Sequence, residues 1–549
     1  MRNRWQRPPD REEVVGLVLS GGGSRSDFQL GALRYLYDRA GITPQVITGT
    51  SAGSVLAAVL AQSGDHEGQR AGLEDLTRIW LAMRQDSDMF TAREWYATLR
   101  ERGPEWVEAF SLRQRRQGTL GRTFARVANR TTHRAVAPAE LDGAAALAAT
   151  GTHPDGVPGQ GGVPGQGGAE TAAETATAAL AARRAGDGRS VRGAGGAGPA
   201  AGVPAAGGPP RGAAVRDAVK ADRPTAGSAW NPVNVVELLT ALREAGRARP
   251  DLELVVQGAQ RERSMYRLGP IVEELLDPAV FVPERVATSG VTLRIAVVAL
   301  ESGELRYVTE TGLLVDRHNV PLPGPVTVDL VDSIRASCAI PAVFSPVRLG
   351  EEHYVDGGVR EALPAEVAIE DLGVDRCYAV VASPRGVPHQ GSYADKDMLS
   401  IVLRSTAGIM SDEGLRDEVA YARAAGAVVI TPELDIHDAL TIDPGLVSIA
   451  MDYGYLRAAE VVEGAGEDEA RLTRELIEMR RTIWHTEAEL LAPAPDGTTP
   501  DLGELVTLKL RLRALVEQAP ADRLPPGAEG WWRTFERHPW EIAIEPTWA

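Results

Sequence analysis

The sequence predicts an α/β fold of three layers, in which helices cover both faces of a mainly parallel central sheet. Short, apolar, β-branched runs at 14–19 and 46–48 have the composition of buried strands. Each run leads through a glycine-containing turn into a helix-like segment, at 27–39 and 52–62 respectively. Strand, turn and helix repeated in this order are typical of parallel strands joined by crossover helices.

The same reading extends toward the C-terminus. We expect a helix over 235–242, a strand over 293–300 paired with 306–308, a strand over 377–382, a long helix over 397–425 and a strand over 427–430. Beyond residue 466 the chain becomes charged and helical, with helices expected over 467–490 and 502–516. A tail with four tryptophans follows, for which docking on apolar surface is favoured over insertion into a membrane interface.

Composition divides the chain further. Residues 138–228 are dominated by Ala, Gly and Pro, and the hexapeptide GVPGQG occurs twice in succession at 156–167. Such a segment buries too little apolar surface to offset its chain entropy, so we expect a long disordered insertion. The predicted units are a polar tail (1–13), a catalytic domain in two parts (14–137 and 229–465), the insertion (138–228) and a helical extension (466–549).

Bulk charge and cysteine content exclude several classes of protein. The 549 residues carry a formal net charge of −17, which disfavours broad binding to nucleic acid. Two cysteines cannot form a disulfide framework, and no cluster resembles a metal site. The first 13 residues lack the apolar stretch of a secretory signal, and no apolar run reaches the roughly 20 residues that span a bilayer. We expect a cytoplasmic protein without a cofactor, with peripheral contact at a membrane surface as an option.

The first candidate for chemistry is the pentapeptide Gly49-Thr50-Ser51-Ala52-Gly53, which matches G-x-S-x-G between a predicted strand and a predicted helix. That context is the one a nucleophile elbow requires, because the sharp turn exposes the serine hydroxyl above the sheet. An ordinary turn with a helix-capping serine would have the same sequence. By itself, the motif leaves both interpretations open.

A glycine loop forms the second candidate, Gly21-Gly22-Gly23-Ser24-Arg25. Acyl transfer creates an oxyanion, which needs backbone N–H donors fixed in advance, and a glycine run between strand and helix can present them. A plain tight turn and a phosphate-binding loop are the alternatives. The phosphate-binding reading is weakened because G-x-G-x-x-G fails at Ser26 and no Gly-Lys-Ser/Thr follows.

The third candidate is Asp356, in the only Asp-Gly-Gly of the chain, at the end of a probable strand. A serine nucleophile needs a base within hydrogen-bond reach, and none of the nine histidines stands in a context that indicates this role. We therefore expect a Ser51–Asp356 dyad, in which a desolvated pocket raises the basicity of the carboxylate. An ordinary Asp-Gly turn is the alternative for Asp356.

Taken in order, these three motifs resemble the patatin family of phospholipases, and the segment 333–341 resembles the one preceding that family's catalytic aspartate. The resemblance covers roughly residues 14–460 without the insertion. It implies a Ser–Asp dyad at Ser51 and Asp356, an oxyanion hole at Gly21–Arg25, lipid acyl-ester substrates and no metal. Ser26 departs from the family's glycine, which leaves the loop geometry to be checked.

Other readings stay open. The same dyad could serve an acyltransferase, the fold could be a catalytically silent scaffold, and the glycine loop could bind a nucleotide. Seven arginines without an acid at 111–134 suit either lipid head groups or a solvated helix face. Apolar residues at 265–276 suit either a cap over the site or core packing.

Overall fold

The computed structural model describes residues 13–98, 261–387, 404–491 and 501–542, with a few isolated positions beside these ranges. Contacts divide the chain into two units, Met1–Gly151 with Trp230–Ala549, and Thr152–Ala229. All described residues belong to the first unit. The predicted insertion, the helix at 235–242 and the arginine-rich segment at 111–134 lie outside the described residues.

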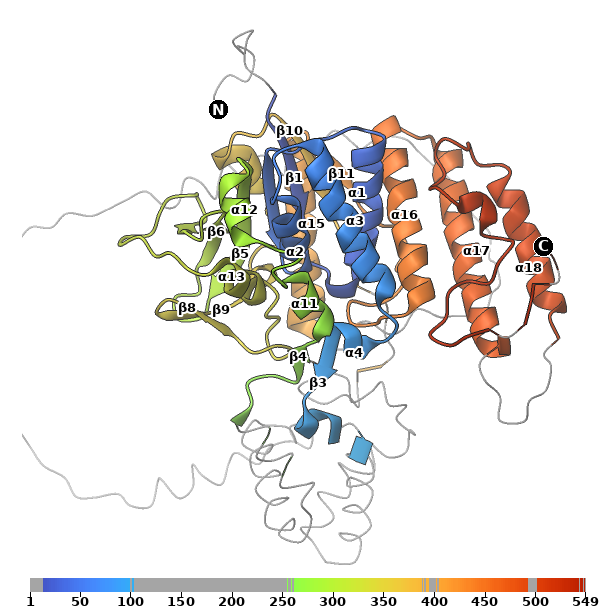
Figure 1. Cartoon of the computed structure of the whole chain (residues 1–549), viewed down its shortest axis with the longest axis horizontal. Helices are drawn as coiled ribbons and strands as arrows, with labels where there is room; N and C mark the ends of the chain where they lie inside the picture. Colours follow the sequence, from blue (N-terminus) through green and yellow to red (C-terminus); the bar gives the residue numbers. More distant parts are fainter. Residues whose placement is uncertain are drawn as a thin grey trace, which may run out of the picture. The chain divides into compact units, whose positions relative to one another are not determined.

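A central sheet lies among the helices (Figure 1). Its strand order is β11-β10-β1-β2-β5-β6-β7, with β9 pairing β5 and β8 pairing β9. The five strands from β11 to β5 are mutually parallel, and β6, β7, β8 and β9 pair antiparallel. The predicted mainly parallel α/β sheet is therefore confirmed. The strands are β1 (Val15–Leu19), β2 (Val46–Thr50), β5 (Thr292–Ala299), β6 (Leu305–Thr309), β7 (Leu314–Asp316), β8 (Val347–Leu349), β9 (Glu352–Asp356), β10 (Arg376–Val380) and β11 (Val428–Ile430). A separate two-stranded antiparallel sheet consists of β3 (Phe90–Ala92) and β4 (Tyr266–Leu268).

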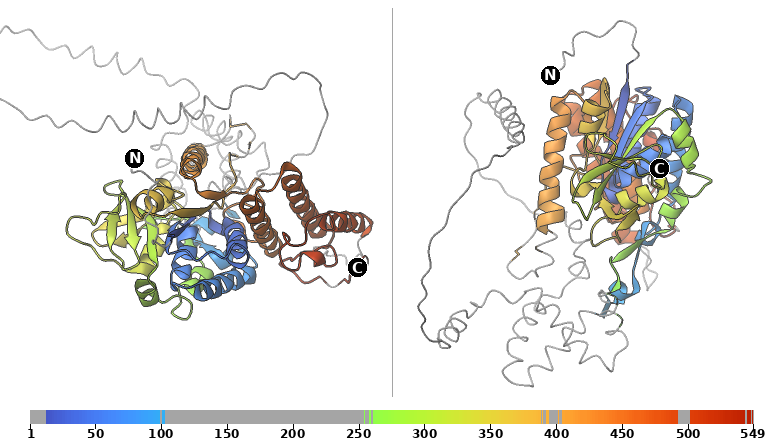
Figure 2. Two further views of the ribbon diagram at one scale, coloured as in Figure 1. Left: turned by 90° about the horizontal axis from the view of Figure 1, so that it is seen from above. Right: turned by 90° about the vertical axis from the view of Figure 1, so that its left-hand side faces the viewer.

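Helices cover both faces of this sheet (Figure 2). Alternate residues of β1 point to opposite sides, so Leu17 and Leu19 pack into the core with the N-terminal helices while Val18 joins a second cluster with Val419 and Ala422. Both faces of a parallel strand are thus apolar and buried, as the continuous run of β1 predicts. The helices are α1 (Ser26–Asp38), α2 (Ala52–Leu60), α3 (His66–Ala82), α4 (Asp86–Met89), α11 (Pro270–Leu275), α12 (Pro283–Thr288), α13 (Leu330–Ser337), α15 (Ser411–Ala424), α16 (Pro444–Glu463), α17 (Glu467–Leu491) and α18 (Gly503–Val516).

None of the described helices is both long enough and apolar enough to cross a membrane. The residues at 265–276 for which a cap was one option divide between two places. Tyr266 and Leu268 belong to strand β4 of the small β3–β4 sheet, whereas Ile271 and Leu275 lie in the main hydrophobic core. For the second pair, core packing accounts for the apolar side chains.

Helix α16 packs against α1 at a crossing where the two backbones nearly touch. A Cβ atom added to Gly454 would lie 1.9 Å from the carbonyl oxygen of Phe28, so no side chain fits there. The rings of Phe28 and Tyr453 meet edge to face beside it, with centroids 5.4 Å apart. This crossing matters for the site because α1 begins directly after the glycine loop.

Gly454→Ala should therefore destabilise the protein by about 1–3 kcal/mol, because the added methyl group forces the two helices apart. Chemical or thermal unfolding measures the change. Gly414→Ala is the matched control, since Gly414 also lies within a helix, is exposed, and has open space around its Cβ position. The control should be neutral or stabilising by up to about 1 kcal/mol, and equal losses in both variants would contradict the packing argument.

The C-terminal helices α17 and α18 belong to the same compact unit as the sheet. Helix α17 packs along α16, and the tail after α18 folds back onto the two helices. Trp531, Trp532 and Trp548 lie in the apolar cluster formed there, and the Trp548 indole donates to the Trp532 carbonyl at 2.6 Å. These three tryptophans cover the helical extension, as the docked interpretation of the tail predicts.

Candidate active site

Ser51 stands in a strained turn between β2 and α2. Its backbone has φ 54° and ψ −131°, a conformation that is costly for any residue with a Cβ. The start of α2 approaches the end of β1 so closely that a Cβ on Gly53 would lie 2.5 Å from the carbonyl oxygen of Ser20, so only glycine fits there. The hydroxyl of Ser54 donates to the Ser51 carbonyl at 2.6 Å and holds the start of α2. This is the backbone geometry that a nucleophile elbow requires, and the Ser51 side chain makes no capping hydrogen bond to the helix.

The strand order brings Asp356 beside Ser51. Thr50, at the end of β2, is in register with Ala296 of β5, and the next residue along β5, Val297, is in register with Asp356 of β9. Val297 also pairs with Arg306 of β6, so β9 lies on the same edge of β5 as β2 and continues that edge where β2 ends. The two candidate residues therefore lie at the junction of β2 and β9, although they are 305 positions apart in the sequence (356 minus 51).

Both side chains are buried, with Ser51 5% and Asp356 4% exposed. Burial raises the pKa of Asp356 to about 6, against the opposing effects of a hydrogen bond from the Ser51 side chain and one from the Gly358 amide. The Gly358 amide lies 2.8 Å from the Asp356 carboxylate. A carboxylate that is buried, titrates near neutrality and contacts a serine hydroxyl is suited to accept that serine's proton.

The end of α13 fixes the backbones of both residues. The Ser51 amide donates to the Ser337 hydroxyl at 2.9 Å, and the Asp356 amide donates to the Ala339 carbonyl at 3.0 Å. Between them lies Cys338, whose thiol has a pKa raised by burial and by the neighbouring Asp356 carboxylate. Sequence reasoning noted this segment only for its resemblance to a family and did not assign it these contacts.

The glycine loop lies against the elbow, since a Cβ on Gly21 would be 3.1 Å from the Cβ of Ser51. Not all of its amides are available as donors. The Gly21 amide donates to the Ala362 carbonyl at 3.0 Å, the Ser24 amide to the Ala439 carbonyl at 3.0 Å, and the Arg25 amide to the Gly22 carbonyl at 3.3 Å. Within the described part of the chain, the backbone amides of Gly22 and Gly23 donate no hydrogen bond. Of the residues Gly21–Arg25 predicted to bind an oxyanion, only these two therefore have an amide free to do so.

Ser26, the departure from the glycine expected at this position, has an unstrained backbone, although its buried hydroxyl has no hydrogen-bond partner among the described residues. Its backbone is right-handed helical, with φ −66° and ψ −10°, so no glycine conformation is needed there. The side chain is fully buried at the first position of α1. The geometry of the loop is thus compatible with a Cβ at residue 26.

Two further acids, the buried Glu361 and the half-buried Glu418, hold the segment that contacts the glycine loop. Burial raises the pKa of Glu361 to about 7 and that of Glu418 to about 8. The Glu418 carboxylate accepts from the amides of Ala362 at 3.1 Å and Leu363 at 2.7 Å, while the Glu361 carbonyl accepts from the Thr50 hydroxyl at 3.1 Å. Because the Ala362 carbonyl holds the Gly21 amide, this segment connects α15, the nucleophile strand and the glycine loop.

No described histidine hydrogen-bonds with Ser51 or Asp356. His437, which the sequence placed in a polar loop context, is instead buried and its ring contacts Asp27 at 2.6 Å. Within the described ranges, no group of three or more His, Cys, Asp or Glu residues is arranged to hold a metal ion.

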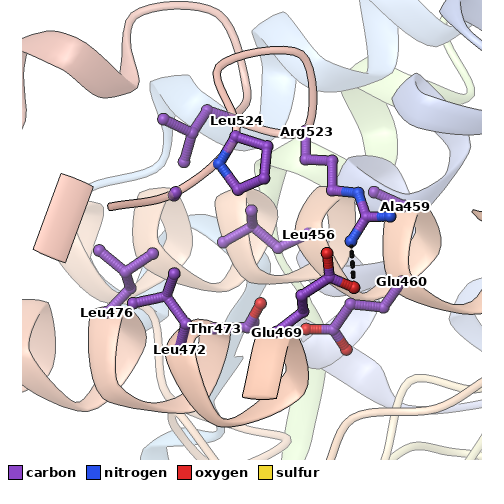
Figure 3. Close-up of a pocket in the computed structure, with 11 residues that line it drawn as sticks. Leu456, Ala459, Glu460, Glu469, Leu472, Thr473, Leu476, Arg523 and Leu524 are labelled. Atoms are coloured by element: carbon purple, nitrogen blue, oxygen red, sulfur yellow. Dashed lines mark ion pairs between the residues drawn. The ribbon is translucent and has the colours of Figure 1, made fainter. Parts of the chain in front are cut away.

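A small cavity lies away from the dyad, between α16, α17 and the loop at 519–524 (Figure 3). Its volume is about 30 Å³, enough for one or two waters and too small for a lipid. An ion pair of 2.6 Å between Arg523 and Glu469 borders it. The cavity belongs to the packing of the C-terminal helices and contains none of the candidate site residues.

A strained serine at a strand-to-helix turn is a feature of α/β serine hydrolases as a class. More specifically, the sequence model described as patatin-like phospholipase matches residues 17–192 and 193–369, and the chain belongs to this family. The resemblance predicted from the three motifs is therefore confirmed.

Two individual proteins show similarity to the chain, one over a short segment and one over nearly its full length. A patatin-like phospholipase domain-containing protein of Phaeosphaeria nodorum (strain SN15) is 37% identical over 84 residues, which are 15% of this chain and 10% of that protein. The chain thus matches about a tenth of the relative's length. The crystal structure of VipD from Legionella pneumophila aligns with a TM-score of 0.28 and 12% identity over 95% of this chain and 84% of that one, a similarity too low to support an inference.

Proposed function

We propose that this protein hydrolyses the acyl ester bonds of lipids, with Ser51 as nucleophile, Asp356 as general base and the amides of Gly22 and Gly23 as the oxyanion hole. The observation that carries the proposal is the placement of two buried side chains beside each other: Ser51 lies at a strained elbow, and burial raises the pKa of Asp356 to about 6 against the effect of the Ser51 hydroxyl. Membership of the patatin-like phospholipase family supports a lipid substrate.

In the first half of the reaction, the Ser51 oxygen attacks the acyl carbonyl while its proton moves to the Asp356 carboxylate. The carbonyl oxygen becomes an oxyanion and accepts hydrogen bonds from the two free amides. When the tetrahedral intermediate collapses, the ester C–O bond breaks and the leaving alcohol takes the proton from Asp356. The acyl group is then attached to Ser51 as an ester.

In the second half, Asp356 removes a proton from water, and the resulting hydroxide attacks the acyl-enzyme. A second oxyanion forms in the same place, the Ser51–acyl bond breaks, and the proton returns from Asp356 to the Ser51 oxygen. The fatty acid leaves and the dyad is restored. If another alcohol replaces water in this half, the same site acts as an acyltransferase, and product analysis with an added alcohol acceptor separates the two reactions.

The test is a panel of phospholipid and neutral-lipid esters offered to the wild type and to Ser51→Ala. Loss of the nucleophile should lower turnover by at least about 10³-fold and abolish labelling by a fluorophosphonate probe, since only an activated serine reacts with it. Ser302→Ala, in an exposed turn between β5 and β6, is the control and should keep both. A wild type that neither labels nor hydrolyses any ester would instead favour a silent scaffold.

A further inference from the structure

A short segment at 435–439, here called the clasp, contacts the glycine loop through several hydrogen bonds. The Ser24 hydroxyl donates to the Asp438 carbonyl at 2.8 Å, and the Ser24 amide donates to the Ala439 carbonyl at 3.0 Å. The backbone of Gly23 has φ 60°, and a Cβ there would lie 2.4 Å from the same Ala439 oxygen. The clasp therefore fixes the positions of Gly23 and Ser24.

The clasp also holds the next residue of the loop. The Arg25 guanidinium makes two hydrogen bonds with the Asp435 carboxylate, at 3.0 and 2.7 Å, and one with the His437 carbonyl at 3.0 Å. The Asp435 carbonyl in turn accepts from Arg481 of α17 at 2.9 Å. Every residue from Gly23 to Arg25 is thus in contact with the clasp, while the amides of Gly22 and Gly23 point to no described partner.

The buried ring of His437 anchors the clasp, because it lies between two hydrogen-bond acceptors, the Asp27 carboxylate and the Asp438 carbonyl. Its Nε2 lies 2.6 Å from the Asp27 carboxylate, and its Nδ1 lies 2.9 Å from the Asp438 carbonyl. A carbonyl oxygen can only accept, so Nδ1 carries a proton. A second proton must lie between Nε2 and Asp27, because a lone pair facing a carboxylate at this distance would be repelled.

Several charged groups act on this pair. Burial lowers the pKa of His437, but the charge of Asp27 and the hydrogen bonds to Asp27 and Asp438 more than offset it and raise the pKa above its usual 6.5, against the nearby Arg25. Burial also raises the pKa of Asp27, opposed by His437, the Phe28 amide and Arg25. The Asp438 carboxylate faces away, toward the Leu440 amide and the Thr441 hydroxyl.

We propose that the His437–Asp27 pair is a positioning device for the oxyanion hole: the proton shared by the two side chains fixes the clasp, and the clasp fixes Gly23 and Ser24. The proposal rests on the function proposed above. His437 touches neither Ser51 nor Asp356 among the described contacts, so it acts through the loop and not on the substrate.

A pH dependence with a definite sign follows. The stabilisation from a His437 whose pKa is raised is complete below 6.5 and is lost as pH rises through the raised value. Activity should accordingly fall on the alkaline side when the pair gives up its shared proton. This alkaline limb is separate from the acid limb near pH 6 that belongs to Asp356.

Asp27→Asn separates geometry from titration. The asparagine oxygen can take the place of the Asp27 oxygen that accepts from the Phe28 amide at 2.7 Å, and its NH₂ group can donate to a neutral His437 Nε2. The contacts remain, but no shared proton is left to lose. We expect kcat near that of the wild type at neutral pH and no alkaline limb in the pH profile.

His437→Ala removes the anchor. It should lower kcat by about 10²-fold, the usual effect of losing one oxyanion donor, with little change in KM. The proposal is overturned if Asp27→Asn keeps the alkaline fall of the wild type, or if His437→Ala keeps full kcat.

Thermal unfolding of the wild type and Asp27→Asn between pH 6 and 10 gives a readout that does not depend on catalysis. Only the wild type should lose melting temperature on the alkaline side through this pair. If the wild type hydrolyses no ester, the proposed function fails while this comparison still decides on the clasp: parallel curves overturn it, and diverging curves support it.

Discussion

Asp356→Asn should lower ester hydrolysis by about 10²- to 10⁴-fold, the usual contribution of a general base, while leaving the fold intact. Asparagine has nearly the same shape, and its oxygen can still accept the Gly358 amide that lies 2.8 Å from the carboxylate. What it cannot do is take a proton from Ser51. The substitution therefore removes the base without removing the turn that positions it.

The pH profile of the wild type provides the second part of this measurement. Asp356 must be ionised to act as a base, and its pKa is raised to about 6. Below this value the carboxyl group is protonated and kcat/KM should fall about tenfold per pH unit. Retention of a tenth or more of the activity in Asp356→Asn, or an unshifted acid limb in that variant, would show that another group is the base.

Features that depend on neighbouring residues could be predicted from the sequence. The run Val15–Leu19, the glycine loop and the pentapeptide around Ser51 each fix a local geometry, and the structure has the strand, turn and helix where the patterns place them. The pairing of 306–308 with the strand at 293–300 was also predictable, since a short turn joins them. Ser51 and Asp356 were found together because two independent motifs pointed to one chemistry.

Features that depend on partners far along the chain could not be predicted. His437 meets Asp27 across 410 positions, and neither residue lies in a periodic pattern that indicates burial. Glu418 was likewise hidden within a helix of ordinary charged composition. Helix α16 escaped prediction for a different reason: most of its residues are buried on all sides, so it has no polar face to reveal a helical period.

The C-terminal helices contain the other large effect that the structure predicts. Lys509 of α18 and Glu487 of α17 are both fully buried and form an ion pair of 2.8 Å. Lys509 also donates to the Thr534 carbonyl at 2.6 Å, and the second oxygen of Glu487 accepts from the Glu536 amide at 2.8 Å. These contacts join the two helices to the tail that folds back over them.

From the tail, the network continues to the sheet domain. The Glu536 carboxylate accepts two hydrogen bonds from Arg480, each 2.8 Å long, and Arg480 reaches Asp452 of α16 at 2.6 Å. Because α16 packs on α1, the extension is connected through buried charges to the helix that carries Asp27. Loss of this network should therefore be felt as global instability rather than as local fraying.

Lys509→Met should lower the free energy of unfolding by about 3–5 kcal/mol, because it leaves the buried Glu487 carboxylate with only the Glu536 amide and the His538 ring, 3.1 Å away, as partners. Denaturation by urea or heat measures the loss.

Lys509→Met combined with Glu487→Gln removes both charges, and the glutamine oxygen can still accept the Glu536 amide, so the double variant should recover part of the stability. As a control, Arg471 of α17 forms exposed ion pairs with Asp468 and Glu475. Arg471→Ala should lower the free energy of unfolding by at most about 1 kcal/mol. If the double variant is no more stable than the single one, the cost comes from packing around Lys509 and not from the uncompensated charge.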